Sequence, residues 1–227
     1  MTLQSQGSSL ALSANDGFPL TAYLARPGAS PRGAIVVIQE IFGVNGHIRS
    51  LCDGFAADGY VAIAPALFDR IEPGIELGYG EPDVARGREL KGKADTVQAL
   101  LDVEAALDEV REYGRAGVVG YCWGGYLAWL AACRIDGLSA AVVYYGGGIG
   151  DVLNEVPRCP VLGHFGERDA AIPLTQVEAW RKQHPDHPVH TYDAGHGFSC
   201  DHRGSYNAAA ATLARSRTLA FFREHVG

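Results

Sequence analysis

The chain has no long hydrophobic run, no long run of charges of one sign and no closely spaced pair of cysteines. Its longest apolar stretches, at 34–38 and 139–145, are far shorter than the roughly 20 residues that a membrane-spanning helix needs. The N-terminus also lacks the charged-then-apolar order of a signal peptide. We therefore expect a cytoplasmic protein with no membrane partner.

Charge is only weakly biased. The 227 residues include 26 acidic and 19 basic side chains, which give a formal net charge of −7 at pH 7. Because neither sign collects in a run, the sequence offers no basic surface for a nucleic acid or another polyanion. We expect a small-molecule substrate, no nucleic-acid partner, and a monomer or a small homo-oligomer.

Cysteine is scarce and scattered. The five cysteines lie at positions 52, 122, 133, 159 and 200. Their odd number, wide spacing and lack of a C-x-x-C motif argue against a disulfide framework and against a structural zinc site. No group of His, Asp and Glu residues has metal-ligand spacing, so we expect no metal. If one of these cysteines has a function, we therefore expect that function to depend on the reactivity of its thiol.

The pattern of hydrophobic residues predicts an α/β fold. Residues 8–24 form two short runs around a turn of Asn, Asp and Gly, which is typical of an antiparallel hairpin. Six later runs are rich in β-branched or aromatic residues and bounded by Gly or Pro, as strands covered on both faces are. These runs span 33–40, 59–67, 116–121, 138–146, 159–166 and 188–195.

Helical patterns separate the predicted strands. They span 94–112, 125–134, 174–184 and 206–224. Such regular alternation implies crossover connections, and hence a mostly parallel, doubly wound sheet after the N-terminal hairpin. With 47% hydrophobic residues the chain can bury the core of a single α/β domain, which we expect to span 1–227.

Two segments carry more specific expectations. In the helix predicted over 94–112, an apolar stripe should face the core while the charged residues, Asp102 among them, stay outside it. The stripe comprises Val97, Leu100, Leu101, Leu107 and Val110. The stretch 68–93 has no convincing period and is rich in Gly, Pro and charge. We expect a long loop there, and loops of such length are more often functional than idle.

Cys122 stands in the stretch GYCWGG, directly after the strand predicted over 116–121. Ligands of such sheets bind at the carboxyl ends of the strands. The spacing Gly120-x-Cys122-x-Gly124 is that of a nucleophile elbow with cysteine in place of serine, where glycines make room for a sharp turn. The thiol would lie at the N-terminus of the helix 125–134, where the helix dipole favours a thiolate. The alternative is a buried core cysteine.

An elbow nucleophile needs an orienting acid and a histidine, which follow it in that order along the chain. Asp169 and His196 each follow a predicted strand downstream of Cys122, and His196 lies between two glycines. We therefore expect a catalytic triad of Cys122, His196 and Asp169. The alternatives are a helix or turn cap for Asp169, with Glu167 as a rival acid, and a loop histidine held by Asp193 for His196.

An oxyanion hole should lie next to the nucleophile. In this arrangement one N–H group comes from the loop after an early strand and the other from the residue after the nucleophile, which assigns Ile41 and Trp123. Glu40, directly before Ile41, is unexpected because a carboxylate repels the negative charge that develops there. The alternative is that Glu40 is a solvated loop acid.

Four motifs together, QEIFGVN, GYCWGG, ERD and AGHGF, resemble the dienelactone hydrolase (carboxymethylenebutenolidase) family of the α/β-hydrolase superfamily. The resemblance runs over nearly the whole chain. It implies a cofactor-free hydrolase that opens lactones or cleaves small esters through an acyl-enzyme. It also implies that Glu40 holds the resting thiol of Cys122 and takes its proton when substrate arrives, after which His196, oriented by Asp169, assists hydrolysis of the acyl-enzyme.

The resemblance further implies that two arginines hold a carboxylate of the substrate. Arg86 and Arg88, before the long helix, are both candidates for the first, with a solvated surface position as the alternative for each. The fourth residue after His196, where the family has the second arginine, is Cys200. Arg203 is the nearest arginine and becomes the candidate for that role.

Aromatic side chains are expected around the acyl group. Tyr145, at the end of a predicted strand, is a candidate for substrate contact or simply a packed strand residue. Trp123 and Phe198 are expected to line the pocket.

Two further functions remain as alternatives. One is a broader carboxylesterase or thioesterase, which the cysteine at position 200 favours. The other is a non-catalytic binding or redox-sensing protein that uses Cys122 as a reversible thiol switch. A metal-dependent hydrolase is disfavoured by the lack of ligand spacing.

Overall fold

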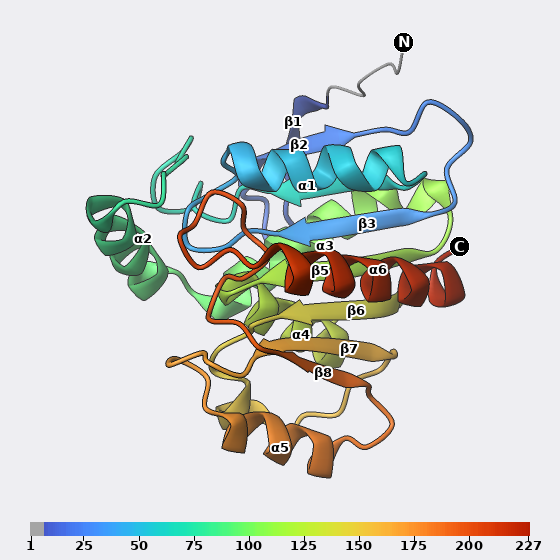
Figure 1. The fold of residues 1–227 in the computed structure, drawn as a ribbon. Helices are drawn as coiled ribbons and strands as arrows, with labels where there is room; N and C mark the ends of the chain where they lie inside the picture. The colour runs from blue at the N-terminus through green and yellow to red at the C-terminus, as the bar shows by residue number, and fades with distance from the viewer. Residues whose placement is uncertain (1–6) are drawn as a thin grey trace.

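Strands and helices alternate along the chain and build one sheet flanked by helices (Figure 1). The computed structural model describes residues 7–227, so the first six residues of the domain expected over 1–227 lie outside it. Over the described residues, eight strands form a sheet in the order β1-β2-β4-β3-β5-β6-β7-β8. The strands are β1 (Ser8–Ser13), β2 (Pro19–Ala25), β3 (Ala34–Ile38), β4 (Val61–Pro65), β5 (Ala116–Tyr121), β6 (Leu138–Tyr144), β7 (Val161–Gly166) and β8 (Val189–Tyr192).

The sheet has the predicted topology. β1 and β2 form the N-terminal hairpin, and β2 pairs antiparallel with β4, whereas all the other pairs are parallel. Every residue of β3, β4 and β5 is buried, as expected of strands covered on both faces, which explains their continuous apolar sequences. The prediction of a mostly parallel, doubly wound sheet with an antiparallel hairpin is confirmed.

The helices lie on both faces of the sheet. α1 and α6 cover one face and α3 and α4 the other (Figure 1). The helices are α1 (Gly46–Ala57), α2 (Glu81–Lys93), α3 (Thr96–Val110), α4 (Trp123–Arg134), α5 (Leu174–Gln183) and α6 (Ala208–His225), with short 3-10 turns at Arg111–Tyr113 and Ile149–Val152. The four helices predicted from the sequence are present as α3, α4, α5 and α6. No helix within residues 7–227 is long and apolar enough to cross a membrane.

α3 buries more of its surface than one apolar stripe. Asp102, expected on the exposed side, is fully buried, whereas Val97, expected in the stripe, is 63% exposed. The helix packs against the sheet, β1 and α4 at once, so its buried face extends around to Asp102. Arg70 neutralises this carboxylate, with its Nε 2.9 Å from Oδ2 of Asp102, and its Nη1 also lies 2.7 Å from Oδ2 of Asp16. This ion triad ties the hairpin and the loop after β4 to α3.

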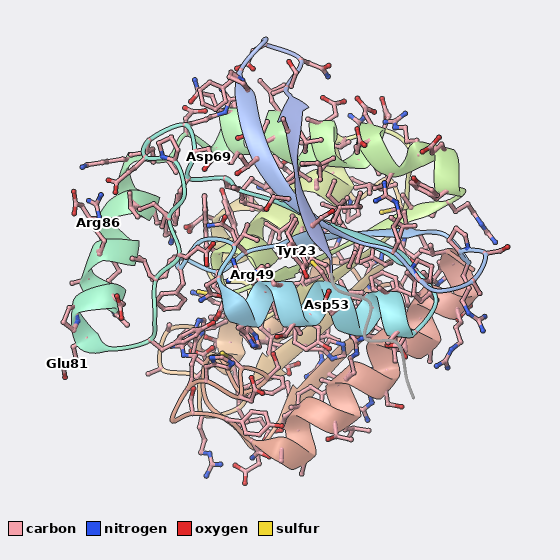
Figure 2. The ribbon with its side chains drawn as sticks, turned by 90° about the horizontal axis from the view of Figure 1, so that it is seen from above. Tyr23, Arg49, Asp53, Asp69, Glu81 and Arg86 are labelled. Carbon is pink, nitrogen blue, oxygen red and sulfur yellow. The ribbon has the colours of Figure 1, made fainter. Side chains whose placement is uncertain are left out.

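The stretch expected as a loop over 68–93 contains a helix in its second half. α2 is mostly polar and buries only Gly87 and Leu90 among its residues, so the sequence has no hydrophobic period to reveal it. Acidic residues in its first turn and basic residues in its last turn complement the helix dipole. Figure 2 places Glu81 and Arg86 at the periphery of the molecule.

The first half of that stretch is a loop that is tied to its neighbours. Oδ2 of Asp69, a residue labelled in Figure 2, accepts hydrogen bonds from the N–H and the hydroxyl of Thr21 on β2, at 2.8 and 2.7 Å. Farther along, the N–H of Leu77 donates to the carbonyl oxygen of Phe42 at 2.8 Å. These contacts bring Tyr79 to the loop that follows β3.

Candidate active site

Cys122 sits on a sharp turn between β5 and α4. Its φ is +55°, a conformation that non-glycine residues rarely adopt, and its N–H donates to the carbonyl oxygen of Tyr144 at 3.0 Å. A Cβ at Gly120 would lie 1.8 Å from the carbonyl oxygen of Gly124, so no side chain fits there. The half-buried Cys122 side chain therefore stands on a strained strand-to-helix turn, the backbone geometry of a nucleophile elbow.

His196 and Asp169 form a close pair. Nδ1 of His196 lies 2.7 Å from Oδ2 of Asp169, whose side chain is fully buried. The N–H of Ala171 donates to the other oxygen of Asp169 at 2.9 Å, which fixes the carboxylate. Asp193, the alternative partner of His196, pairs instead with Arg168, and its Oδ1 lies 3.0 Å from Nε of Arg168. Because Nδ1 faces Asp169, Nε2 of His196 is left to act on the substrate side.

The electrostatics of His196 favour its protonated form. Burial by itself lowers the pKa of the ring, but Asp169 and the adjacent Cys122 side chain outweigh burial and raise the pKa of His196 to about 10. A ring that keeps its proton can stabilise a negatively charged sulfur and later donate the proton to a leaving group. The Cys122, His196 and Asp169 side chains predicted from the sequence are thus brought together in one connected group.

A cavity of about 370 Å³ opens next to Cys122 and His196. Its described lining residues are Ile41, Phe42, Val84, Arg88, Lys91, Cys122, Trp123, Gly147, Gly148, Ala171, His196 and Arg203. Ile41 follows β3 and Trp123 begins α4, so both backbone segments border the nucleophile. Within residues 7–227 neither of their N–H groups donates a hydrogen bond, which leaves both free for an oxyanion.

The structure separates the candidate arginines. Arg88 and Arg203 line the cavity, but Arg86 does not. The Arg86 guanidinium instead pairs at the surface with Glu72 and Glu89, its Nη1 lying 2.7 Å from Oε2 of Glu89. Arg86 is therefore not placed to bind substrate, because it lies on the outer side of α2.

Lys91 is a cavity residue that the sequence analysis missed. Val84, Arg88 and Lys91 all line the cavity from α2. Their spacing of four and three residues is that of one helix face, and this spacing was the signal available in the sequence. The prediction of a loop over 68–93 hides this helical spacing.

Tyr145 and Phe198 lie behind the cavity and do not line it. Both are fully buried, with their rings 5.4 Å apart. The hydroxyl of Tyr145 lies 2.6 Å from Oγ of Ser199, and its ring is 5.1 Å from the ring of His196. The position of Tyr145 agrees with the alternative of a packed strand residue, and Phe198 does not line the cavity as expected. Trp123 alone of the three expected aromatics lines the cavity.

Glu40 is fully buried, so it is not a solvated loop acid. Its Oε1 accepts from Nη1 of Arg203 at 3.2 Å, and its Oε2 accepts from the hydroxyl of Tyr79 at 3.1 Å. Among the described residues, no hydrogen bond joins Glu40 to Cys122, in contrast to the resting arrangement that the resemblance implies. Tyr79 is a further site residue that the sequence analysis missed, because it comes from a loop with no motif.

The same region gathers metal-ligating side chains. Donor atoms of Glu40, His47 and Cys200 all lie within 4.8 Å of one another, and so do those of His47, Asp201 and His202. Spacing along the chain does not reveal the first group, because Cys200 is distant from Glu40 and His47 and joins them only when the loops after β3 and β8 fold together.

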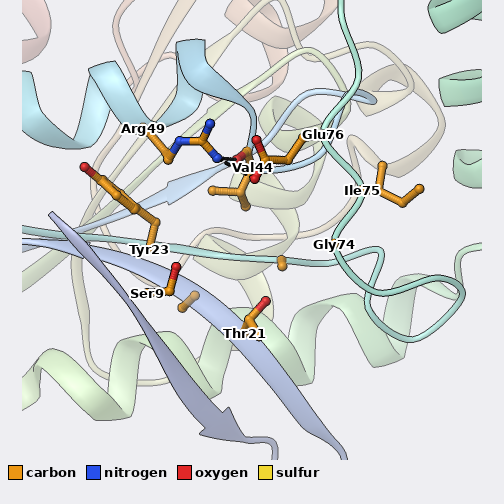
Figure 3. A pocket seen from close by; sticks show the side chains of 10 residues that line it. Ser9, Thr21, Tyr23, Val44, Arg49, Gly74, Ile75 and Glu76 are labelled. Atoms are coloured by element: carbon orange, nitrogen blue, oxygen red, sulfur yellow. Dashed lines mark hydrogen bonds and ion pairs between the residues drawn. The ribbon is translucent and has the colours of Figure 1, made fainter.

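A second pocket, far smaller, lies between β2 and the loop before α2 (Figure 3). An ion pair between Nη1 of Arg49 and Oε1 of Glu76, 2.6 Å apart, borders it. Its volume of about 60 Å³ corresponds to about two water molecules, so it is too small for a substrate.

Comparisons with known proteins point to one family. The sequence profile of the dienelactone hydrolase family matches residues 20–226. The carboxymethylenebutenolidase of Pseudomonas putida is 35% identical over 226 residues, covering 93% of this chain and 94% of the relative. A Synechocystis sp. protein provisionally named carboxymethylenebutenolidase is 34% identical over 230 residues, covering 92% of this chain and 93% of the relative.

Solved structures agree with the sequence comparisons. A crystal structure from Klebsiella pneumoniae subsp. pneumoniae, provisionally named dienelactone hydrolase, has a TM-score of 0.84 and 31% sequence identity. The match covers 96% of this chain and 100% of that one. The chain therefore belongs to the dienelactone hydrolase family, and it is a hydrolase with the α/β-hydrolase fold.

Proposed function

We propose that this hydrolase opens lactones or cleaves small esters through a Cys122, His196 and Asp169 triad and a covalent acyl-enzyme. The observation that carries the proposal is the position of Cys122 on a strained elbow, beside a histidine that a buried aspartate orients. Such a turn is energetically costly, and proteins keep this strain where it presents a reactive side chain.

The chemistry follows from the positions of these groups. The sulfur of Cys122 attacks the carbonyl carbon of the substrate, and the electrons of the C=O bond move to the oxygen. The N–H groups of Ile41 and Trp123 stabilise this oxyanion. The intermediate then expels the alcohol or ring oxygen, which takes the proton from Nε2 of His196, and a thioester remains. His196 next removes a proton from water, whose oxygen attacks the thioester carbonyl. The thiolate of Cys122 then leaves and regains its proton from Glu40.

The cavity favours a negatively charged substrate. Of the described residues that line it, Arg88, Lys91 and Arg203 are basic and none is acidic. Arg203 is also a partner of Glu40, so a carboxylate bound to Arg203 competes with Glu40 for the guanidinium. We propose that this competition frees Glu40 to take the thiol proton of Cys122, so that acylation is faster when an acidic substrate is bound.

The test is ring opening of dienelactone beside hydrolysis of a small neutral aryl ester, with wild type and Cys122→Ala in parallel. We expect wild type to prefer the acidic lactone and Cys122→Ala to lose several powers of ten in turnover on both substrates. Undiminished turnover by a folded Cys122→Ala variant would remove the triad from the mechanism.

A broader carboxylesterase or thioesterase is the second candidate, and one observation favours it. Cys200 occupies the position four residues after His196 where the family resemblance calls for an arginine. The same assay decides between the two, because a preference for the neutral ester keeps the triad chemistry but removes the acidic substrate.

A further inference from the structure

Three side chains with metal-binding donors converge beside the active site. Glu40 follows β3, His47 lies in the first turn of α1, and Cys200 lies in the loop between β8 and α6. A carboxylate oxygen, a ring nitrogen and the sulfur lie within 4.8 Å of one another. All three residues are at least nine-tenths buried, so these donors are held in place by the surrounding fold.

The hydrogen bonding of the His47 ring also points to a bound metal ion. Its Nδ1 lies 3.3 Å from Oδ1 of Asp201, while its Nε2 is buried and has no hydrogen-bond partner within the part of the chain that the structure describes. A carboxylate on one nitrogen fixes the proton there and leaves the lone pair on the other, which is the arrangement of metal-bound histidines. A buried ring nitrogen without a partner is otherwise unfavourable.

We propose that Glu40, His47 and Cys200 bind a thiophilic divalent cation of the Zn²⁺ class. Sulfur, imidazole and carboxylate are ligands of Zn²⁺, whereas Mg²⁺ and Ca²⁺ prefer oxygen ligands alone. Ligand atoms of tetrahedral Zn²⁺ lie about 3.5 Å apart, as bonds of about 2.0–2.3 Å require, so only small side-chain movements are needed. Three protein ligands leave the fourth position to water.

Charge and protons balance at this site. The thiol of Cys200 releases its proton to solvent as the sulfur binds the cation, and the thiolate and the Glu40 carboxylate together neutralise two positive charges. Tyr79 and Arg203 now bind that carboxylate. The cation competes with them for it.

The surface offers a route of access. Asp201 and His202 are 63% and 52% exposed, and their donors lie within 4.8 Å of a ring nitrogen of His47. A cation that first meets this outer group can pass to the buried group through His47, which belongs to both. Asp201 then remains as the carboxylate that orients the histidine.

Direct binding tests the site without reference to catalysis. Co²⁺, which substitutes for Zn²⁺ and reports thiolate ligation by its charge-transfer absorption, is titrated into the full chain carrying Cys122→Ser, so that the half-buried thiol beside the cavity does not contribute. We expect one Co²⁺ per chain with a thiolate band, displaced by Zn²⁺. Adding Cys200→Ser abolishes the band, and adding His47→Gln or Asp201→Asn weakens binding at least tenfold.

Two matched variants make the test decisive. Cys52→Ser changes a buried cysteine outside the group, and we expect it to leave the band unchanged. His202→Ala removes a donor of the outer group only, and the band should persist. An absent band, a band that survives Cys200→Ser, or binding that His202→Ala alone removes would overturn the proposal. Asp201→Asn alters an exposed residue, so its result stands even where a buried variant fails to fold.

Zn²⁺ should also inhibit hydrolysis, because a Glu40 carboxylate that binds the cation cannot take the proton of the Cys122 thiol. This consequence rests on the proposed function, whereas binding does not. We expect wild-type turnover to fall on addition of Zn²⁺ and to return with a chelator. Cobalt binding with an intact thiolate band but no inhibition would leave the metal site standing and remove Glu40 from the catalytic steps.

Discussion

Nη1 of Arg203 lies 3.2 Å from Oε1 of Glu40, which joins a fully buried acid to the wall of the cavity that holds Cys122. The other oxygen of Glu40 is bound by Tyr79. Among the described residues, only the side chain of Arg203 both hydrogen-bonds this carboxylate and lines the cavity. In the proposed mechanism, a carboxylate of the substrate acts on Glu40 by competing for this guanidinium.

Arg203→Met should lower kcat/KM for dienelactone by about 10- to 100-fold and lower it much less for a neutral aryl ester. The reason is that hydrogen bonds to charged groups contribute about 1.5–3 kcal/mol, and only the acidic substrate makes one here. Steady-state kinetics on both substrates measure the difference.

Arg86→Met is the matched control. The Arg86 guanidinium pairs with Glu72 and Glu89 at the surface, so its loss should leave both substrates unaffected. Equal losses for the two substrates in Arg203→Met would mean that this arginine supports the site without recognising charge.

Glu40→Gln should slow acylation by about 100-fold, because an amide cannot take the proton of the Cys122 thiol. Deacylation depends on His196 and should change little. Rapid-mixing kinetics with a chromogenic aryl ester that carries a carboxylate separate the two steps through the burst of released alcohol. Glu72→Gln serves as the control at an exposed acid. An unchanged burst rate in Glu40→Gln would limit Glu40 to holding Arg203 in position.

The sequence predicted the features that depend on local rules. Gly120 and Gly124 mark the turn around Cys122 because any Cβ there would strike the backbone, and the order of acid and histidine follows the order of the strands. The positions of these residues in the structure agree with the prediction. Their chemical roles stay predictions, as do the single domain over 1–227, the cytoplasmic location and the oligomeric state.

The remaining features depend on contacts between distant segments. Tyr79 reaches Glu40 only because its loop is bonded to Phe42, and Asp102 is buried only because Arg70 neutralises it. α2 buries only Gly87 and Leu90, and its polar sequence carries no hydrophobic period. Neither spacing nor composition records such pairings, so the sequence could not predict them.

Arg70→Met should destabilise the fold by about 3–5 kcal/mol, because it leaves the carboxylate of Asp102 buried without a partner. Burial already raises the pKa of Asp102 even with Arg70 present. Urea unfolding measures the loss. Adding Asp102→Leu to Arg70→Met should recover most of it, since the buried charge is then gone. Asp16→Asn changes the more exposed ion pair of Arg70 and should lower the free energy of unfolding far less. An equal loss would show that the pair of Arg70 and Asp16 provides the stabilisation.

His164 should make the fold less stable in mild acid. The ring is fully buried, with Nδ1 2.8 Å from the hydroxyl of Tyr192 and Nε2 3.1 Å from Oγ1 of Thr218. Burial lowers the pKa of His164 well below 6.5, and the positive charges of His190 and Arg217 lower it further. Below pH 6.5 the His164 ring is protonated in the unfolded chain but stays neutral in the folded chain. The stability from the neutral ring is therefore fully present above pH 6.5 and is lost as the pH falls below that value toward the folded pKa.

His164→Gln should flatten this pH dependence, because the amide can keep hydrogen bonds to both neighbours but does not titrate. One proton corresponds to a slope of up to about 1.4 kcal/mol per pH unit, so the difference between wild type and variant is measurable by urea unfolding between pH 5 and pH 6.5. Above pH 7 the two stability curves should run parallel, which separates the titration from any packing defect. Equal slopes below pH 6.5 would show that other groups cause the acid sensitivity.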